Sequence, residues 1–364
     1  MIESKKTLKN SSLLLSGSLI LFSISSCIQK PSKTPDKETS AKELSVSEAS
    51  ANRSITKNSI DIAHLPTNEN SGLSNGTKAP MSIESKSTKS TTEFKFKYTL
   101  NKPAKVYVMD RRLMEISGLS CSNNQSELLG INDEKGYIFV MDKLTGKVRS
   151  TYDFGKNGDY EGIEQVGNII YVVNSSGNIF AFDKDSEKTE KIKLKLKTKN
   201  DVEGLGYIPS ENMLTLACKG SDTLGKETKD NKGRKAIYSY SLTTNKLNEE
   251  PLLVITDEEL LNELDSSTNL LSKSGQKKLK NRLKQFSPSG IAYNESEDLF
   301  YLVSSQGKTL IVVNRSSEVI HIDFLNSSVY TQPEGICFDS SGNLFISNEA
   351  RGLIPKLVRC SPNN

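Results

Sequence analysis

Apolar residues occur along much of the chain in short runs that are separated by Gly, Asn and Ser. After Gly162 the runs cover 163–166, 169–173 and 179–182, and a fourth strand is expected at 191–196. Four short strands with turn residues between them, and no helix, are typical of one blade of a β-propeller. The second run of each group is continuously apolar, which indicates a sheet covered on both faces.

Each group of strands begins with a motif in which Glu or Ser precedes Gly and an aliphatic residue. The copies read EISGL at 115–119, DYEGI at 159–163, DVEGL at 201–205, SPSGI at 287–291 and QPEGI at 332–336. Their glycines recur roughly every forty residues, with one interval about twice as long, which is typical of a repeat architecture. The copies predict an all-β, five-bladed propeller, with six blades as the alternative if the segment 241–286 hides a degenerate blade.

The long interval also contains two predicted helices, at 257–264 and 270–286, so we expect a helical insertion at about 256–286. The second helix is rich in Lys and could contact anionic lipid or a polyanion. The other interpretation, a solvated cap on the propeller, is favoured because the apolar face of this helix is thin.

The two ends of the repeat array complement each other. Only three strands follow the last motif, ending at 356–360, whereas an additional strand at 105–109 precedes the first motif. An open ring would leave strand hydrogen-bonding groups free to pair with other chains. We therefore predict that 105–109 pairs with 356–360 and closes the ring.

The beginning of the chain has the features of a targeting segment. Three lysines fall within the first nine residues, an apolar run covers 13–22, and ISSC at 24–27 ends in Cys27. The run is too short to span a bilayer. The order of these features resembles a bacterial lipoprotein signal, which predicts a signal peptide at 1–26 and acyl chains such as palmitate on Cys27. The alternative is an ordinary secretory signal with a chance Cys.

The segment that follows is rich in Ser, Thr and Lys, and it has few aromatic residues. Such a composition cannot bury enough apolar surface to offset the entropy of ordering. We expect 27–92 to be a disordered tether and 93–361 to be the propeller. The predicted location is the cell envelope, attached to a membrane by lipid, with the periplasmic and surface faces both open.

Composition excludes several kinds of function. The chain has 48 basic and 44 acidic residues, a formal charge of +4, which offers no electrostatic case for nucleic acid. Its two histidines are His64, in the predicted tether, and His321, in an apparent outer strand, and these positions exclude Ser-His-Asp or Cys-His catalysis and a His-ligated zinc. The other cysteines are expected to be single buried thiols, with a disulfide also open in an oxidising compartment; they are Cys121, Cys218, Cys337 and Cys360.

The acidic residues of the motifs are the candidate site. If each motif strand is the innermost of its blade, Glu161, Glu203 and Glu334 converge at one end of the channel, together with Ser117 and Ser289. Converging carboxylates and hydroxyls suit a hard cation such as calcium. The alternative is that each Glu accepts hydrogen bonds from the backbone of a neighbouring blade. Further candidates for a channel-facing pocket lie at the ends of second strands: Asn132, Asp133, Asn174, Asn348 and Glu349.

Several motifs in order resemble the SdiA-regulated propeller family. They are SPSGIAY at 287–293, QPEGICFD at 332–339 and GNLFISNE at 342–349, with the opening motifs at 115–119 and 159–162. The resemblance covers about 98–360. It implies a propeller related in shape to phytase-like propellers, secreted or membrane-anchored, without a well-established activity. The third blade departs from the pattern, reading LACKG at 216–220 where relatives more often have an acidic residue.

Two classes of function follow. The first is a non-catalytic binding or scaffold lipoprotein of the envelope, because no catalytic constellation is found. The second is a calcium-dependent phytase-like or lactonase-like hydrolase, by analogy of fold, and fold alone does not establish function. A phosphate-ester hydrolase would need basic residues beside the metal, and the motif strands have none. We expect a monomer that is anchored to a membrane and binds a small molecule or an envelope protein.

Overall fold

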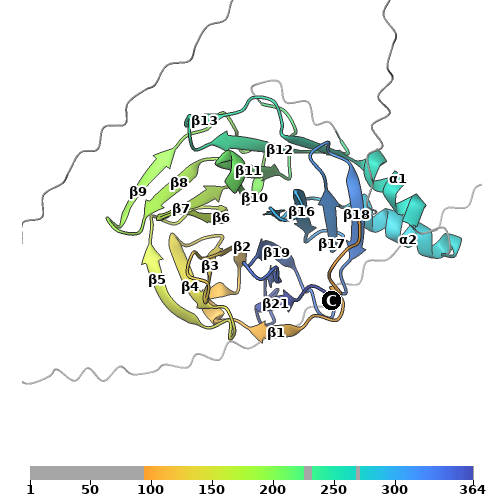
Figure 1. Cartoon of the computed structure of the whole chain (residues 1–364), viewed down its shortest axis with the longest axis horizontal. Coiled ribbons are helices and arrows are strands. Elements are labelled where there is room, and N and C mark those ends of the chain that lie inside the picture. Colours follow the sequence, from red (N-terminus) through yellow and green to blue (C-terminus); the bar gives the residue numbers. More distant parts are fainter. Residues whose placement is uncertain (1–93, 225–231, 268–270, 364) are drawn as a thin grey trace, which may run out of the picture. The chain divides into compact units, whose positions relative to one another are not determined.

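The blades of the propeller are antiparallel sheets arranged in a ring, four of them four-stranded and one five-stranded (Figure 1). The computed structural model describes residues 94–363, with gaps at 225–231 and 268–270. The predicted signal peptide, Cys27 and the tether lie outside the described residues. The first blade consists of β2 (Ile116–Cys121), β3 (Glu127–Asn132), β4 (Tyr137–Asp142) and β5 (Val148–Asp153). The second consists of β6 (Tyr160–Val166), β7 (Ile169–Asn174), β8 (Ile179–Asp183) and β9 (Lys188–Ile192).

The remaining blades follow the same order from the channel outward. The third consists of β10 (Val202–Ile208), β11 (Met213–Cys218), β12 (Arg234–Ser241) and β13 (Lys246–Leu247), with β14 (Leu253–Thr256) also paired to β12. The fourth consists of β15 (Gly290–Asn294), β16 (Leu299–Ser304), β17 (Thr309–Val313) and β18 (Val319–Phe324). The fifth consists of β19 (Pro333–Phe338), β20 (Leu344–Asn348), β21 (Lys356–Cys360) and β1 (Lys105–Val108). Two 3₁₀ helices lie at Arg111–Leu113 and Pro209–Glu211.

The ends of the described chain meet in the fifth blade. Strand β1 pairs antiparallel with β21, Lys105 opposite Arg359 and Val108 opposite Lys356. The predicted closure of the ring is therefore confirmed, and so is the count of five blades rather than six. The segment 241–286 contributes β13, β14 and two helices but no blade of its own. The predicted fourth strand at 191–196 is wrong in position, because β9 begins at Lys188 after a tight turn at Glu187 (φ 52°).

The motif glycines explain how the inner strands pack. A Cβ added to Gly162 would lie 2.6 Å from the backbone nitrogen of Leu205, which is in the inner strand of the next blade. At Gly335 the corresponding distance to the nitrogen of Leu119 is 2.4 Å. Real side chains do not tolerate such contacts, so only Gly allows the strands around the channel to approach this closely. The repeated Gly is thus a packing requirement at each junction between blades.

Two helices cover the outside of the fourth blade: α1 (Asp257–Ser267) and α2 (Lys273–Leu283). Leu260 and Leu283 are buried in one apolar cluster with Ile311 of β17. Arg282 fixes α2 further, because its Nε donates to the carbonyl of Gly307 at 2.7 Å and its Nη2 to that of Lys308 at 2.7 Å. In the described part of the chain, neither helix is long and apolar enough to cross a membrane.

Candidate functional site at the channel mouth

The motif residues meet where the inner strands begin. A cavity of about 710 Å³ lies there, and its lining includes Ser117, Glu161, Glu203 and Glu334. Ser289 does not line this cavity and lies in the narrow gap between the motif strands, where its Oγ donates to the carbonyl of Pro333 at 2.8 Å. The structure therefore brings Ser117, Glu161, Glu203 and Glu334 together at one end of the channel and leaves Ser289 outside this cavity.

The second-strand candidates divide into two groups. Asp133 and Glu349, which follow the last residues of β3 and β20, line the cavity. Asn132 and Asn174 hold their own turns, because their Oδ1 atoms accept from the backbone nitrogens of the residues three and four positions later. Asn348 is fully buried and lies outside the lining. In the first and fifth blades the residue just beyond the second strand therefore reaches the cavity, while the last residue of the strand does not.

Burial and neighbouring charges raise the pKa values of the carboxyl groups in the ring. Burial raises the pKa of Glu161 to about 9, and the nearby carboxylates of Glu203, Asp159 and Glu334 add to the increase. Burial also raises the pKa of Glu334 to about 8, although a hydrogen bond from Gln332 opposes this. Both groups hold protons at neutral pH because no charge compensates them fully.

Glu203 has a cationic partner. Lys219, the residue after β11, places its Nζ 2.8 Å from Oε1 of Glu203. Burial still raises the pKa of Glu203, and Lys219 acts against that increase. Burial alone would lower the pKa of Lys219, but the hydrogen bond and charge of Glu203 outweigh it and raise the pKa.

A second acidic group stands at the edge of the ring. Burial raises the pKa of Asp133, and the charges of Glu115 and Glu134 raise it further. Burial likewise raises the pKa of Glu349, with Arg351 acting in the opposite direction. Glu115, Asp133 and Glu349 all line the cavity, so its acidic wall extends from the first blade to the fifth.

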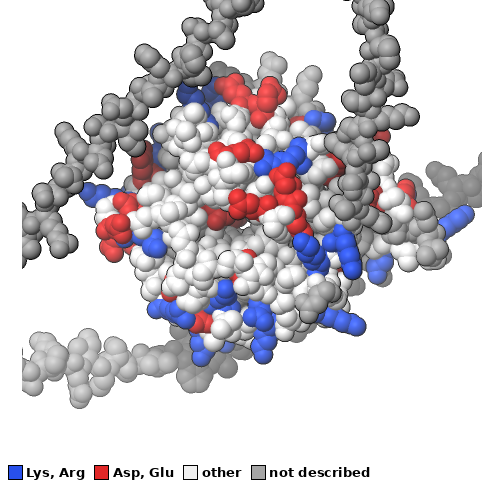
Figure 2. All heavy atoms as spheres, in the orientation of Figure 1, with Lys and Arg blue, Asp and Glu red and all other residues white. Residues whose placement is uncertain are grey.

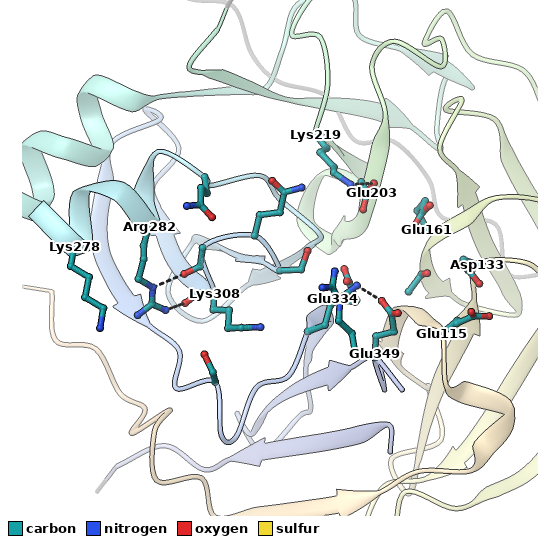
Figure 3. A pocket seen from close by; sticks show the side chains of 18 residues that line it. Glu115, Asp133, Glu161, Glu203, Lys219, Lys278, Arg282, Lys308, Glu334 and Glu349 are labelled. Carbon is teal, nitrogen blue, oxygen red and sulfur yellow. Dashed lines mark hydrogen bonds and ion pairs between the residues drawn. The ribbon is translucent and has the colours of Figure 1, made fainter. Parts of the chain in front are cut away.

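Basic residues form the opposite wall of the cavity (Figure 3). Lys308 lies in the turn between β16 and β17, Arg351 follows β20, and Lys278 and Arg282 belong to α2. Burial lowers the pKa of Lys308, and the nearby cations of Arg351 and Arg282 lower it further. In the space-filling view, acidic side chains gather around the centre of the ring with basic ones beside them (Figure 2).

Gln332 connects the two walls. Its Nε2 donates to Oε2 of Glu349, and its Oε1 accepts from Nε of Arg351. Lys308 donates from Nζ to the carbonyl of Thr331. These contacts join Glu349 and Arg351 to Gln332 within the fifth blade, and they join Lys308 of the fourth blade to Thr331 of the fifth.

The sequence did not predict the basic wall, because Lys308 and Arg351 lie outside the motifs and the Lys-rich helix that contains Lys278 was favoured as a solvated cap. One signal was available: the residue after the second strand lines the cavity in four of the blades, as Asp133, Lys219, Ser305 and Glu349. Lys219 was noted only as a departure from the family pattern. Lys278, Lys308 and Arg351 occupy positions that the repeat does not mark.

The ring does not have the arrangement of a prebuilt calcium site. Lys219 occupies one oxygen of Glu203, and none of the described residues form a group of three or more His, Cys, Asp or Glu side chains able to hold a metal ion. Side chains contact two of the carboxylates, because Lys219 binds Glu203 and Gln332 donates a hydrogen bond to Glu334, and the alternative of backbone contacts stays a prediction as well. Calcium binding by Glu161, Glu203 and Glu334 stays a prediction.

The fold and the cavity together define a five-bladed β-propeller with a charged pocket at one end of its channel. A family model described as SdiA-regulated matches residues 89–352. The chain therefore belongs to the SdiA-regulated family, as its motifs predicted. A search of curated proteins found no match.

Solved structures resemble the fold at low identity. Glutaminyl cyclase of Myxococcus xanthus is 11% identical, with a TM-score of 0.44, over 72% of this chain and 96% of that one. The PQQ-bound aldose sugar dehydrogenase of Streptomyces coelicolor is 11% identical, with a TM-score of 0.43, over 72% and 98% of the two chains. A luciferin-regenerating enzyme is 12% identical, with a TM-score of 0.42, over 71% and 95%. Similarities at this level carry no argument about function.

Proposed function

We propose that the protein is a non-catalytic binding module of the cell envelope, anchored by lipid on Cys27, whose pocket takes a small zwitterionic ligand. The observation that carries the proposal is the division of one cavity into an acidic and a basic wall. Its volume of about 710 Å³ falls in the usual range for small-molecule sites. The lipid anchor keeps the module at the membrane without a spanning helix.

The acidic wall suits a cationic group of the ligand. Glu161 and Glu334 retain protons near neutral pH because burial opposes their charge. An ammonium group between them would favour the ionised carboxylates, so binding would release protons. Affinity for a ligand whose amine stays protonated should therefore rise as the pH increases toward 8 to 9, the range in which these carboxyls ionise.

The basic wall suits an anionic group. Lys308 and Arg351 lie close enough for Arg351 to lower the pKa of Lys308, which shows that positive charge accumulates there without full compensation. A carboxylate or phosphate of the ligand would relieve that repulsion. A molecule that carries both charges satisfies both walls at once, whereas a simple cation or anion satisfies one.

Calorimetry with matched peptides tests this proposal. The probes are Ala-Ala-Ala with free ends, its N-acetylated form and its C-amidated form. We expect the free peptide to bind and each blocked form to lose at least tenfold in affinity. In Glu161→Gln, acetylation of the peptide should no longer lower its affinity. In Lys308→Met, amidation of the peptide should no longer lower its affinity. Lys188→Met, on the exposed outer strand β9, is the control. Failure of all three peptides to bind, or equal affinities for them, would reject a zwitterion site.

Calcium alone is a further arm of the same experiment. A calcium ion bound by the ring would raise the melting temperature, and a chelator would reverse the increase. If calcium binds and the free peptide does not, the carboxylates form a metal site and the zwitterion proposal is wrong.

One observation favours the hydrolase alternative. The basic residues that the motif strands lack are supplied by the turn at Lys308 and by Arg351, beside the carboxylates. Release of p-nitrophenol from p-nitrophenyl phosphate, and opening of a simple lactone, should be measured with and without calcium. Turnover that disappears in Glu161→Gln and persists in Lys188→Met would favour the hydrolase over the binding module.

A further inference from the structure

Two cysteines meet at the seam where the ring closes. Cys121 ends β2, the inner strand of the first blade, and Cys337 lies in β19, the inner strand of the fifth. Their Sγ atoms are 3.1 Å apart although 216 positions separate them in the sequence. Cys337 is 5% exposed, and both side chains pack in the apolar cluster around Leu119.

The packing of the inner strands enforces this approach. Gly335, two residues before Cys337, lies so close to the first blade that a Cβ there would be 2.4 Å from the nitrogen of Leu119. Leu119 in turn is two residues before Cys121. The two backbones are thus held together two residues before each thiol, so the Sγ contact follows from the packing of the strands and not from one flexible side chain.

The other described cysteines are placed differently. Cys360 has its Sγ 3.7 Å from the hydroxyl oxygen of Tyr330. Cys218 is fully buried within the third blade, in the cluster around Tyr238. No second pair of described thiols shows a contact of this kind, so Cys121 and Cys337 are the specific candidates for pairing.

We propose that Cys121 and Cys337 form a disulfide in the mature protein, which joins the first and last blades covalently. Bond formation requires the sulfur atoms to approach by about 1 Å, to the usual S–S separation of about 2.05 Å. The two thiols lose two electrons and two protons. A small disulfide such as oxidised glutathione accepts them through a mixed disulfide, and leaves as two thiols.

The burial of the two thiols determines when the disulfide can form. Burial raises the pKa of the Cys337 thiol, and the neighbouring Cys121 raises it further, so the reactive thiolate is scarce in the closed ring. Oxidation is therefore expected while the seam is still open during folding. The ring would then be held at two places, by the pairing of β1 with β21 at its rim and by the disulfide near its channel.

The bond needs an oxidising compartment, so its presence in the cell rests on the proposed envelope location. Refolding in vitro tests the pairing independently of location. The full chain carrying Cys27→Ser, which leaves only the four propeller cysteines, is refolded with oxidised glutathione. After alkylation in denaturant, peptides are mapped without reduction.

We expect one cross-linked peptide pair, containing Cys121 and Cys337, with alkylation confined to Cys218 and Cys360. Reduction should then lower the melting temperature by roughly 5–15 °C. Cys121→Ser should show no such response to reduction, and Cys218→Ser should retain it. Complete alkylation of Cys121 and Cys337 after refolding, or a cross-link between another pair, would overturn the proposal. The peptide map uses no substitution in the propeller, so it decides the matter even if Cys121→Ser fails to fold.

Discussion

Glu161→Gln should stabilise the propeller while it weakens the pocket. Burial and neighbouring carboxylates raise the pKa of Glu161 from 4.5 to about 9. The unfolded chain therefore loses this proton at a lower pH than the folded chain, and folding stability falls as the pH rises from 4.5 toward 9. Gln has almost the same shape and no charge, so the substitution removes that pH-dependent loss.

The size of the effect follows from the same shift. At pH 7.5, three pH units above 4.5, the difference in protonation corresponds to at most about 4 kcal/mol, at about 1.4 kcal/mol for each unit. Part of the shift comes from the charges of Glu203 and Glu334, and Lys219 offsets some of it. We therefore expect Glu161→Gln to raise the free energy of unfolding by roughly half of this maximum. A gain of about 2 kcal/mol raises the melting temperature of a domain of this size by about 5 °C.

Urea unfolding at pH 6, 7.5 and 9 measures the prediction. The gain of Glu161→Gln over the natural chain should increase at each step of pH, because over this range the unfolded chain has lost the Glu161 proton that the folded chain still holds. Glu190→Gln, on the exposed outer strand β9, is the matched control and should leave the pH dependence unchanged. A gain for Glu161→Gln that is absent, or the same at all three pH values, would refute the assignment of a strained carboxyl at this position.

Three further results are expected. Gly162→Ala should lower the free energy of urea unfolding by roughly 3 kcal/mol, because its Cβ would lie 2.6 Å from the next blade. The control Gly155→Ala, whose Cβ would have its nearest atom at 3.7 Å, should lower it by less than about 1 kcal/mol. A chain that starts at Arg111 lacks β1 and should lose at least roughly 5 kcal/mol relative to one that starts at Phe94; equal melting would contradict the closure. Cys27→Ser should move the protein from the membrane fraction to the soluble fraction, and a variant that still sediments after salt washing would rule out the lipid anchor.

The repeated motif was sufficient to predict the architecture. Each inner strand approaches the next blade closely, so that an added Cβ at any motif Gly would lie within 3.0 Å of a neighbouring atom, and this local requirement recurs in every blade. It therefore appears in the sequence as a period. The closure was predictable for a similar reason, because a strand left over at one end and missing at the other can satisfy its hydrogen bonds only by pairing. The helical insertion also followed from local pattern.

The chemistry of the pocket depends on tertiary structure. Its basic wall comes from a turn, a loop and a helix that share no motif, and only folding brings Lys278, Lys308 and Arg351 opposite the carboxylates. Asn132 and Asn174 end their strands and bind their own turns, whereas Asp133, one residue beyond β3, lines the cavity. The approach of Cys121 to Cys337 spans nearly the whole propeller, so no local pattern could indicate it. A period in the sequence records what every blade needs for packing, whereas a site built from parts of different blades exists only once the ring has closed.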